Sequence, residues 1–352
     1  MKGFKPMLLP NNKTSVEDIK WSDRITAPRQ WYVSEKYDGI RIELFFNENG
    51  SVVAKTRNLK PFESYFIKTL VDKLHGKIFY NIVLEGEIYV DGLNFNEIIH
   101  LINTRDITSR ANVHKMYNLW TKSNAGTNKN IWPYKNLDLQ KSISYEKNNI
   151  KIMLFDCYHE GTKATFDKRL DLLKRTVDRL NNDVFEIIKQ HDTFESVYEI
   201  YQYYQSVLEK GGEGLVLKYF KNEYKFNRLT DKECQGFKMK DDNKEYTVII
   251  KDVLEGTVVM DGVETTIDEK GYSRTSKSKF DREESGLAKG FLVEHKKYGE
   301  FIVTLKGFTN YDKKQLLINK DEYIGLSCNI YGMKPIRSVP RSAKYIKGKS
   351  EL

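Results

Sequence analysis

A polar break at residues 241–245 divides the chain into two parts that follow different patterns. Before the break, runs rich in β-branched and aromatic residues alternate with segments whose apolar residues recur at helical spacing. After the break, the pattern changes to short strands separated by turns. A chain of 352 residues is long enough to form two domains, each with its own core. We therefore predict an α+β protein with one domain over residues 1–240 and a second over residues 241–352.

The first part contains well-marked strands and helices. Its predicted strands are 40–46, 51–55, 82–90, 150–158 and 214–218, and its predicted helices cover 170–180 and 194–208. The first two strands are expected to form a hairpin, because Asn-Gly at the tip favours a tight turn. Residues 103–149 are polar, and we expect them to be partly helical with a long surface loop.

The second part is predicted to form a small β-barrel. Five short strands are expected within it, at 246–255, 256–260, 291–295, 300–306 and 324–332. Closely spaced short strands suit a five-stranded barrel, and an OB fold is the leading candidate. Residues 268–290 contain few apolar side chains, so we expect a loop that interrupts the barrel.

The composition indicates a partner with negative charge. The chain has 58 Lys and Arg residues against 49 Asp and Glu residues, which gives a net charge of +9. That balance favours a polyanion such as nucleic acid. The three cysteines are far apart and lack metal-ligand spacing, which argues against a disulfide framework or a zinc site. Since no apolar run approaches the length of a membrane span, we expect a cytoplasmic protein, in the host-cell cytoplasm if its source is viral, with no membrane partner.

Lys36 begins a short motif, Lys-x-Asp-Gly-x-Arg, that carries groups for phosphoryl chemistry. A lysine amine attacks phosphorus only when it is neutral, so nearby cations or burial must lower its pKa from about 10.4. Asp38 can orient the amine or bind a metal, and Arg41 can bind a ribose or phosphate oxygen. Gly39 lets the backbone turn close to a nucleotide. The motif also fits an exposed turn before a strand, with Lys36 and Arg41 solvated.

Further clusters of polar and aromatic residues follow at strands or strand ends. They are Thr56-Arg57-Asn58, Glu85-Gly86-Glu87, Phe155-Asp156, Glu213 to Lys218 and Phe237 to Lys240. Each has an ordinary structural explanation. Phe155 suits a core, and the alternating Lys238 and Lys240 suit the outer face of a strand. The order and combination of the clusters are more informative than any one of them.

In their order, these clusters resemble the motifs of the covalent nucleotidyltransferase superfamily, which contains ATP-dependent DNA ligases, RNA ligases and messenger-RNA capping enzymes. The start of the chain, Pro6-Met7-Leu8, is similar to that of many ATP-dependent DNA ligases, and the two-domain plan is similar to the small bacteriophage ligases. The resemblance implies an adenylation (nucleotidyltransferase, ATP-grasp-like) domain with antiparallel sheets and a C-terminal OB-fold β-barrel. It also implies an enzyme that seals 5′-phosphate/3′-hydroxyl nicks in DNA replication, repair and recombination.

The same resemblance implies a role for each motif residue. Lys36 would attack the α-phosphate of ATP and form lysyl-AMP, with Asp38, Lys238 and Lys240 as further catalytic residues. The residues implied in binding ATP are Glu35, Arg41, Arg57, Glu87, Phe155, Lys218, Lys238 and Lys240. Phe155 would stack on the adenine. Mg²⁺, or Mn²⁺ in its place, would be held by Glu213, Glu87 and Asp38.

The basic tail is the implied contact to nicked duplex DNA, the expected partner of a monomeric enzyme that needs no protein partner. Its candidate DNA-binding residues are Lys334, Arg337, Arg341, Lys344 and Lys347. A solvated, disordered terminus fits the same composition. Cellular ligases end with an Arg-x-Asp-Lys motif that this chain lacks, so Lys344 or Lys347 would have to replace it. Phe237 stands where ligases often have tryptophan.

Other activities share part of this pattern. A capping guanylyltransferase shares the lysine motif and the OB domain, and an RNA ligase shares the core. The Thr56-Arg57-Asn58 cluster and the Pro-Met-Leu start favour a DNA ligase. An NAD-dependent ligase would need an extra N-terminal domain and a zinc site built from cysteines. A catalytically silent, OB-containing nucleic-acid-binding protein is the alternative without enzyme activity, but binding alone does not need a buried nucleophile.

Overall fold

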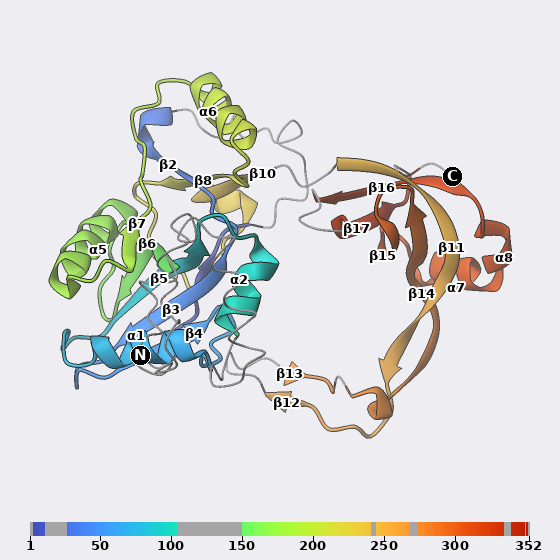
Figure 1. The fold of residues 1–352 in the computed structure, drawn as a ribbon, viewed down its shortest axis with the longest axis horizontal. Helices are drawn as coiled ribbons and strands as arrows, with labels where there is room; N and C mark the ends of the chain where they lie inside the picture. The colour runs from blue at the N-terminus through green and yellow to red at the C-terminus, as the bar shows by residue number, and fades with distance from the viewer. Residues whose placement is uncertain are drawn as a thin grey trace, which may run out of the picture. The chain divides into compact units, whose positions relative to one another are not determined.

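The computed structural model describes residues 3–10, 27–103, 150–240, 244–267, 273–276, 278–333, 339–348 and 350. The chain divides into two compact units, Met1–Lys240 and Asp241–Leu352, each with its own core (Figure 1). The segment predicted at 103–149 lies outside the described residues from residue 104 onward. Within the described ranges, no helix is both long enough and apolar enough to cross a membrane.

The first unit is built on a five-stranded sheet in the order β4-β3-β5-β6-β7. Its strands are β3 (Ile40–Phe46), β4 (Val52–Thr56), β5 (Ile82–Val90), β6 (Ile150–His159) and β7 (Phe185–Ile187). The predicted hairpin forms from β3 and β4, with Gly50 in its turn at a φ of 78°. Neighbouring strands are antiparallel except β6 and β7. The prediction of antiparallel sheets is wrong at this edge, because a helix carries the chain back between the two strands.

Three helices pack with this sheet in one apolar core: α1 (Tyr65–Leu74), α2 (Phe95–Ile102) and α5 (Phe166–Leu180) (Figure 1). The spacing of apolar residues predicts α5, whereas α1 and α2 were not predicted. Helix α2 begins with a capping box, in which Asn94 and Glu97 each accept a hydrogen bond from the other's backbone N–H. The capping box therefore indicates the start of α2, whereas the apolar periodicity over its eight residues is too short to predict a helix.

A separate three-stranded sheet of the first unit has the order β10-β8-β2. Its strands are β2 (Trp31–Glu35), β8 (Gly214–Tyr219) and β10 (Gly236–Lys240), and helix α6 (Val197–Glu209) packs on one face. Side chains alternate between the two faces. Val33 and Leu217 are buried in the core with α6. Ser34, Val216 and Lys238 therefore share the other face, and all three line a cavity.

Gly214 begins β8 at a position that admits no side chain. Its φ is +143°, and a Cβ atom there would lie 2.0 Å from the Met239 carbonyl oxygen. We expect Gly214→Ala to destabilise the first unit through backbone strain and through the clash, each costing about 1–3 kcal/mol. Gly211→Ala is the matched control, because Gly211 has a φ of +85° but nothing within 4 Å. Urea unfolding measures both variants, and equal losses would contradict the steric argument.

Short elements complete the first unit. They are β1 (Met7–Leu8), β9 (Asn227–Arg228) and the 3₁₀ turns Pro28–Gln30 and Asp231–Glu233. Strand β1 pairs parallel with β9, which brings Met7 and Arg228 to the wall of the same cavity. Strand β1 is thus part of the cavity wall.

In the second unit, five strands close into a barrel in the order β11-β14-β15-β17-β16. They are β11 (Lys244–Val259), β14 (Arg282–His295), β15 (Gly299–Lys306), β16 (Ser327–Met333) and β17 (Arg341–Ile346). Helices α7 (Asn310–Ile318) and α8 (Lys320–Tyr323) lie between β15 and β16 in the chain. Phe291, Val303 and Ile330 are among the side chains buried in its core.

The barrel has five strands, but they are not the five that the sequence predicts. The two predicted strands 246–255 and 256–260 form one strand, β11, which ends at Val259, and residues 282–290 of the predicted loop belong to β14. The pairing of β11 with β14 continues to Val259 and Arg282, where most side chains are exposed. Without a buried face, that stretch has no apolar alternation to mark it. The remaining short elements are β12 (Thr266–Ile267), β13 (Ser273–Arg274) and the 3₁₀ turn Lys279–Asp281 (Figure 1).

Candidate active site

A cavity of about 220 Å³ in the first unit is lined by both sheets. The predicted site residues that line it are Glu35, Lys36, Arg41, Arg57, Glu87, Phe155, Lys218 and Lys238. The wall also contains Met7, Ser34, Phe166, Ile188, Gln190, Val216 and Arg228. Three other predicted residues are neighbours of the wall: Asp38 follows Lys36 closely, Glu213 contacts Lys36, and Lys240 follows Lys238 on β10.

Lys36 is held directly after the end of β2. Its backbone N–H donates to the Gly214 carbonyl oxygen at 2.9 Å, which ties the motif to the start of β8. The Nζ of Lys36 donates to Oε2 of Glu213 at 2.5 Å. The two side chains are 24% and 13% exposed, so the amine is sheltered but remains accessible from the cavity.

Glu87 and Lys238 have pKa values displaced toward neutral pH. Burial raises the pKa of Glu87 to about 7, although the positive charges of Lys36 and Arg41 oppose the rise. Burial, with the nearby charges of Arg228 and Lys36, lowers the pKa of Lys238 to about 8. An acid and a base that both change charge near pH 7, in one cavity, are typical of an active site.

Arg41 connects the cavity wall to the N-terminal strand. Its guanidinium forms ion pairs with Glu43 at 2.7 Å and with Glu85 at 2.9 Å, and it donates to the Met7 carbonyl oxygen at 3.3 Å. The Tyr224 hydroxyl donates to Glu85 and accepts a hydrogen bond from the Met7 N–H. Burial raises the pKa of Glu43 well above its usual range, although the Arg41 guanidinium opposes the rise. This network fixes Arg41 and holds β1 against the cavity.

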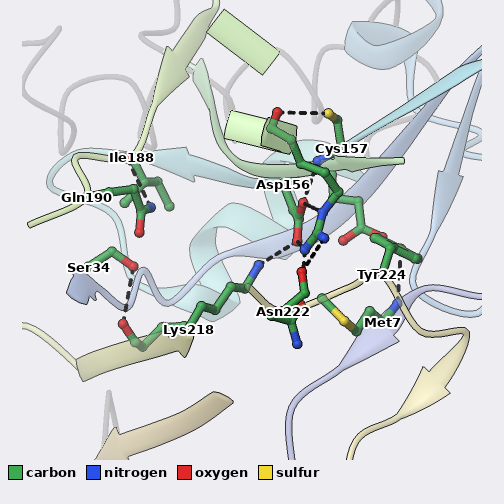
Figure 2. Close-up of polar contacts among 12 residues, drawn as sticks. Met7, Ser34, Asp156, Cys157, Ile188, Gln190, Lys218, Asn222 and Tyr224 are labelled. Carbon is green, nitrogen blue, oxygen red and sulfur yellow. Dashed lines mark hydrogen bonds and ion pairs between the residues drawn. The ribbon is translucent and has the colours of Figure 1, made fainter. Parts of the chain in front are cut away.

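A buried ion-pair network lies behind Phe155. Asp156 accepts hydrogen bonds from Arg169 Nε and from Lys218 Nζ, each at 2.7 Å (Figure 2). The Nζ of Lys218 also lies 5.4 Å from the centre of the Phe155 ring. All five N–H groups of the Arg169 guanidinium have acceptors, supplied by Asp156, Asn222 and two backbone carbonyl groups. The network joins β6, α5 and β8 beneath the cavity.

A comparison with known protein families identifies the family to which this chain belongs. The model of the ATP-dependent DNA ligase domain matches residues 14–240, which is more than half of the chain and includes every cavity residue from Ser34 to Lys238. The chain belongs to the ATP-dependent DNA ligase family. It is an enzyme, and its activity is the ATP-dependent sealing of nicks in DNA.

Solved structures of other DNA ligases share the fold of this ligase. One, from a study of Lig E DNA ligases and their DNA binding with a minimal scaffold, has a TM-score of 0.60 and 18% identity over 97% of each chain. A second, Pmar-Lig_PreS3, has a TM-score of 0.62 and 15% identity over 97% of this chain and 67% of its own. At these identities, the likeness shows the fold alone. No curated protein sequence matches the chain significantly.

Sequence reasoning missed several wall and support residues of the ligase. Arg169 had a signal that could have found it, because it lies on the apolar face of α5, three residues after Phe166 and four before Leu173. A charged residue on such a face must have a buried partner. Arg228 and Gln190 had no such signal, since each lies outside a motif and reaches the cavity only through tertiary pairing.

The predicted DNA-binding tail of the ligase is partly ordered into the barrel. Lys334 and Arg337 lie outside the described residues. Arg341 begins β17, and Lys344 on the same strand pairs in register with Thr304 of β15. Lys347 forms an ion pair with Asp312 at 2.7 Å. The alternative of a disordered terminus is therefore wrong for the β17 segment, because its backbone completes the barrel.

Proposed function

We propose that this ligase works through a covalent lysyl-AMP intermediate on Lys36. The observation that supports the proposal is the position of the Lys36 amine at a cavity whose wall contains Glu87 and several cations. In the first step, Nζ forms a bond to the α-phosphorus of ATP, the bond to the bridging oxygen breaks, and pyrophosphate leaves. AMP then passes to the 5′-phosphate at a nick. The 3′-hydroxyl attacks that phosphate, forms the phosphodiester and releases AMP.

The cavity offers separate partners for each part of ATP. Arg41 and Glu87, which pair in register across β3 and β5, are the proposed contacts to the ribose hydroxyls. Phe155 is the proposed stacking surface for the adenine, and Arg57 the proposed contact to ribose or phosphate. Lys238 lies on the cavity face of β10 and would neutralise the α-phosphate, with Lys240 further along the strand. Fixed cations at that point stabilise the charge that builds up in the transition state.

A magnesium ion fits the carboxylates beside Lys36. Among the described residues, no group of three or more His, Cys, Asp or Glu side chains is arranged to hold a metal by itself. Mg²⁺ usually takes only one or two carboxylates, with water and substrate phosphates as its other ligands. Glu213 and Glu87 are therefore a sufficient set, with Asp38 as a further candidate and Mn²⁺ as an alternative ion. The ion would supply positive charge for the triphosphate.

We assign the adenylation chemistry to residues 1–240 and the binding of nicked duplex DNA to residues 241–352. The barrel supports an OB-fold assignment, because its third and fifth strands, β15 and β17, are parallel neighbours and a helix separates the third strand from the fourth. Arg341 and Lys344 on β17 would contact phosphates. Lys344 is the better candidate to replace the missing C-terminal motif, because Lys347 is engaged with Asp312. Since one chain forms the whole cavity, a monomer is sufficient.

A labelling experiment tests the covalent mechanism. Incubation with Mg²⁺ and α-labelled ATP is expected to attach labelled AMP to the protein, so that the label survives denaturation and leaves when nicked DNA is added. Label from GTP would instead indicate a capping guanylyltransferase, and a preference for nicked RNA would indicate an RNA ligase. A protein that binds nucleic acid but takes no label would overturn the proposal in favour of a silent binding protein.

The rate of lysyl-AMP formation is expected to fall on the alkaline side of about pH 8. Lys238 is charged below a pKa of about 8, so kcat/KM for ATP should decrease as the pH rises above that value. Lys238→Arg should extend activity to higher pH, because a guanidinium remains charged throughout that range. The measurement is kcat/KM for labelling between pH 5.5 and 9.5. An alkaline limb that is unchanged in Lys238→Arg would rule out Lys238 as its source.

A further inference from the structure

The face of the small sheet that lines the cavity carries a row of four different side chains. Val216 of β8 pairs in register with Ser34 of β2 on one side and with Lys238 of β10 on the other. Beyond β2, Val33 and His191 exchange backbone hydrogen bonds of 2.8 Å. In an antiparallel bridge the next residues along are Ser34 and Gln190, and both line the cavity. The row therefore consists of the Gln190 amide, the Ser34 hydroxyl, the apolar Val216 side chain and the Lys238 ammonium.

Along this row the side chains change from uncharged to charged. The uncharged end of the row contains Gln190 and Ser34, and Ile188 is a further uncharged residue of the wall. The charged end contains Lys238, and the other charged wall residues include Arg57 and Arg228, whose positive charges lower the pKa of Lys238. A triphosphate requires the cations, so the uncharged base of the nucleotide is directed to the opposite end. That end is where base identity can be read by hydrogen bonds.

The side-chain amide of Gln190 is oriented by the protein itself. Its Nε2 donates to the Ile188 carbonyl oxygen at 3.1 Å, and Figure 2 shows Gln190 and Ser34 together on the left of the view. Turning the amide over would place Oε1 against the Ile188 carbonyl oxygen, which loses a hydrogen bond and sets two acceptors against each other. Oε1 is therefore kept as an acceptor. The Ser34 hydroxyl makes a longer contact, at 3.5 Å, to the Val216 carbonyl oxygen.

We propose that Gln190 is a specificity-determining residue of this ligase, which selects adenine by accepting a hydrogen bond from the N6 amino group through Oε1. The inference rests on the proposed lysyl-AMP mechanism, because it concerns the nucleotide that feeds it. Adenine presents a donor at its 6-position, whereas guanine presents a carbonyl oxygen there. A fixed acceptor forms a hydrogen bond with the amino group of adenine and repels the carbonyl oxygen of guanine. A polar site built for one partner discriminates strongly, because the wrong partner leaves buried groups unsatisfied.

Nucleotide analogues test this assignment on the intact protein. The probe is purine riboside 5′-triphosphate, which has hydrogen in place of the N6 amino group of ATP. In the wild-type protein, kcat/KM for lysyl-nucleotide formation is expected to favour ATP over this analogue by about 10–100-fold. Gln190→Met keeps the length of the side chain but removes the acceptor, so this ratio is expected to fall toward one. The ratio of ATP use to GTP use is expected to fall in the same variant.

A matched control separates base recognition from general damage. Gln202→Met makes the same chemical change on an exposed position of α6 and is expected to leave both ratios at the wild-type values. A wild-type protein that does not distinguish ATP from the analogue overturns the inference, as does a Gln190→Met variant with an unchanged ratio. In both cases labelling by ATP leaves the lysyl-AMP mechanism intact, whereas no labelling at all overturns both proposals. Gln190→Leu provides a second variant if the methionine variant does not fold.

Discussion

Replacement of Lys36 by alanine is expected to abolish the covalent AMP label. The amine is the proposed nucleophile at the cavity, and loss of a nucleophile typically costs more than about 10⁴-fold in rate. The fold should survive, because the ion pair with Glu213 is partly exposed and such pairs contribute only about 0–1 kcal/mol. Labelling with α-labelled ATP measures the first effect, and urea unfolding measures the second.

Two comparisons show that the loss arises from the missing amine. Lys221→Ala removes an exposed lysine just after β8 and should label like the wild-type protein. Lys36→Ala should still seal a nick whose 5′-phosphate already carries AMP, because that step joins two DNA groups and needs no lysine. Covalent labelling of Lys36→Ala at the wild-type rate would show that another residue is the nucleophile. Failure on the pre-adenylated nick would show that Lys36 also serves the last step.

Sequence reasoning located the parts of the fold whose apolar pattern follows directly from burial. The β3–β4 hairpin and β5 were predicted to within a residue, because their strands carry strong β propensity and an Asn-Gly turn joins the first two. It failed where burial does not follow from the local pattern. The ends of β11 and β14 pair with each other but are mostly exposed, and β17 carries the charges of a basic tail while completing a barrel.

The site residues that were predicted are those that occur in short sequence motifs. Lys36, Glu87 and Lys238 meet at one cavity although they are far apart in the chain, which no spacing rule predicts and only the resemblance supplied. Gln190 was not predicted, because its position depends on the bridge that its neighbour His191 forms with Val33. Such long-range pairings set the wall of the cavity without leaving a local signal.

Lys218 shows the limit of assigning a role from a motif alone. The resemblance implies a contact to ATP, and Lys218 does line the cavity. Its ammonium, however, is committed to Asp156 at 2.7 Å and lies over the Phe166 ring at 4.4 Å. Burial lowers the pKa of Lys218, and Asp156 opposes that change. A structural contribution through Phe155 and Asp156 is therefore as well supported as a direct contact.

Asp156→Asn is expected to cause the largest loss of stability in the first unit. Asp156 is fully buried and is the anion shared by Arg169 and Lys218. An amide in its place leaves two buried cations without a counter-charge, and breaking a buried pair typically costs about 3–5 kcal/mol. Urea unfolding at pH 7 measures the loss. Glu294→Gln, which breaks the exposed pair with Lys251, is the control and is expected to cost less than about 1 kcal/mol.

The pH dependence of this loss provides an independent check. Burial alone would raise the pKa of Asp156, but the charges of Arg169 and Lys218 lower it to about 2 in the folded protein. The unfolded value is about 3.9, so the stabilisation is complete above about pH 5 and is lost progressively as the pH falls to and below 2, by about 2–3 kcal/mol in all. Asp156→Asn has no such titration. The stability difference between wild type and variant should therefore shrink over that range.

A second substitution tests whether the unpaired cations Arg169 and Lys218 cause the loss of stability. Adding Lys218→Met to Asp156→Asn removes one unpaired charge and should restore part of the stability, giving a coupling of about 0.5–3 kcal/mol. Lys218→Met alone should be destabilising, because it leaves Asp156 with one partner fewer. If the two changes were simply additive, Asp156 would act through packing alone and the ion-pair account of the network would be wrong. If they couple as expected, the network beside Phe155 is held together by electrostatic attraction between Asp156 and its two cations.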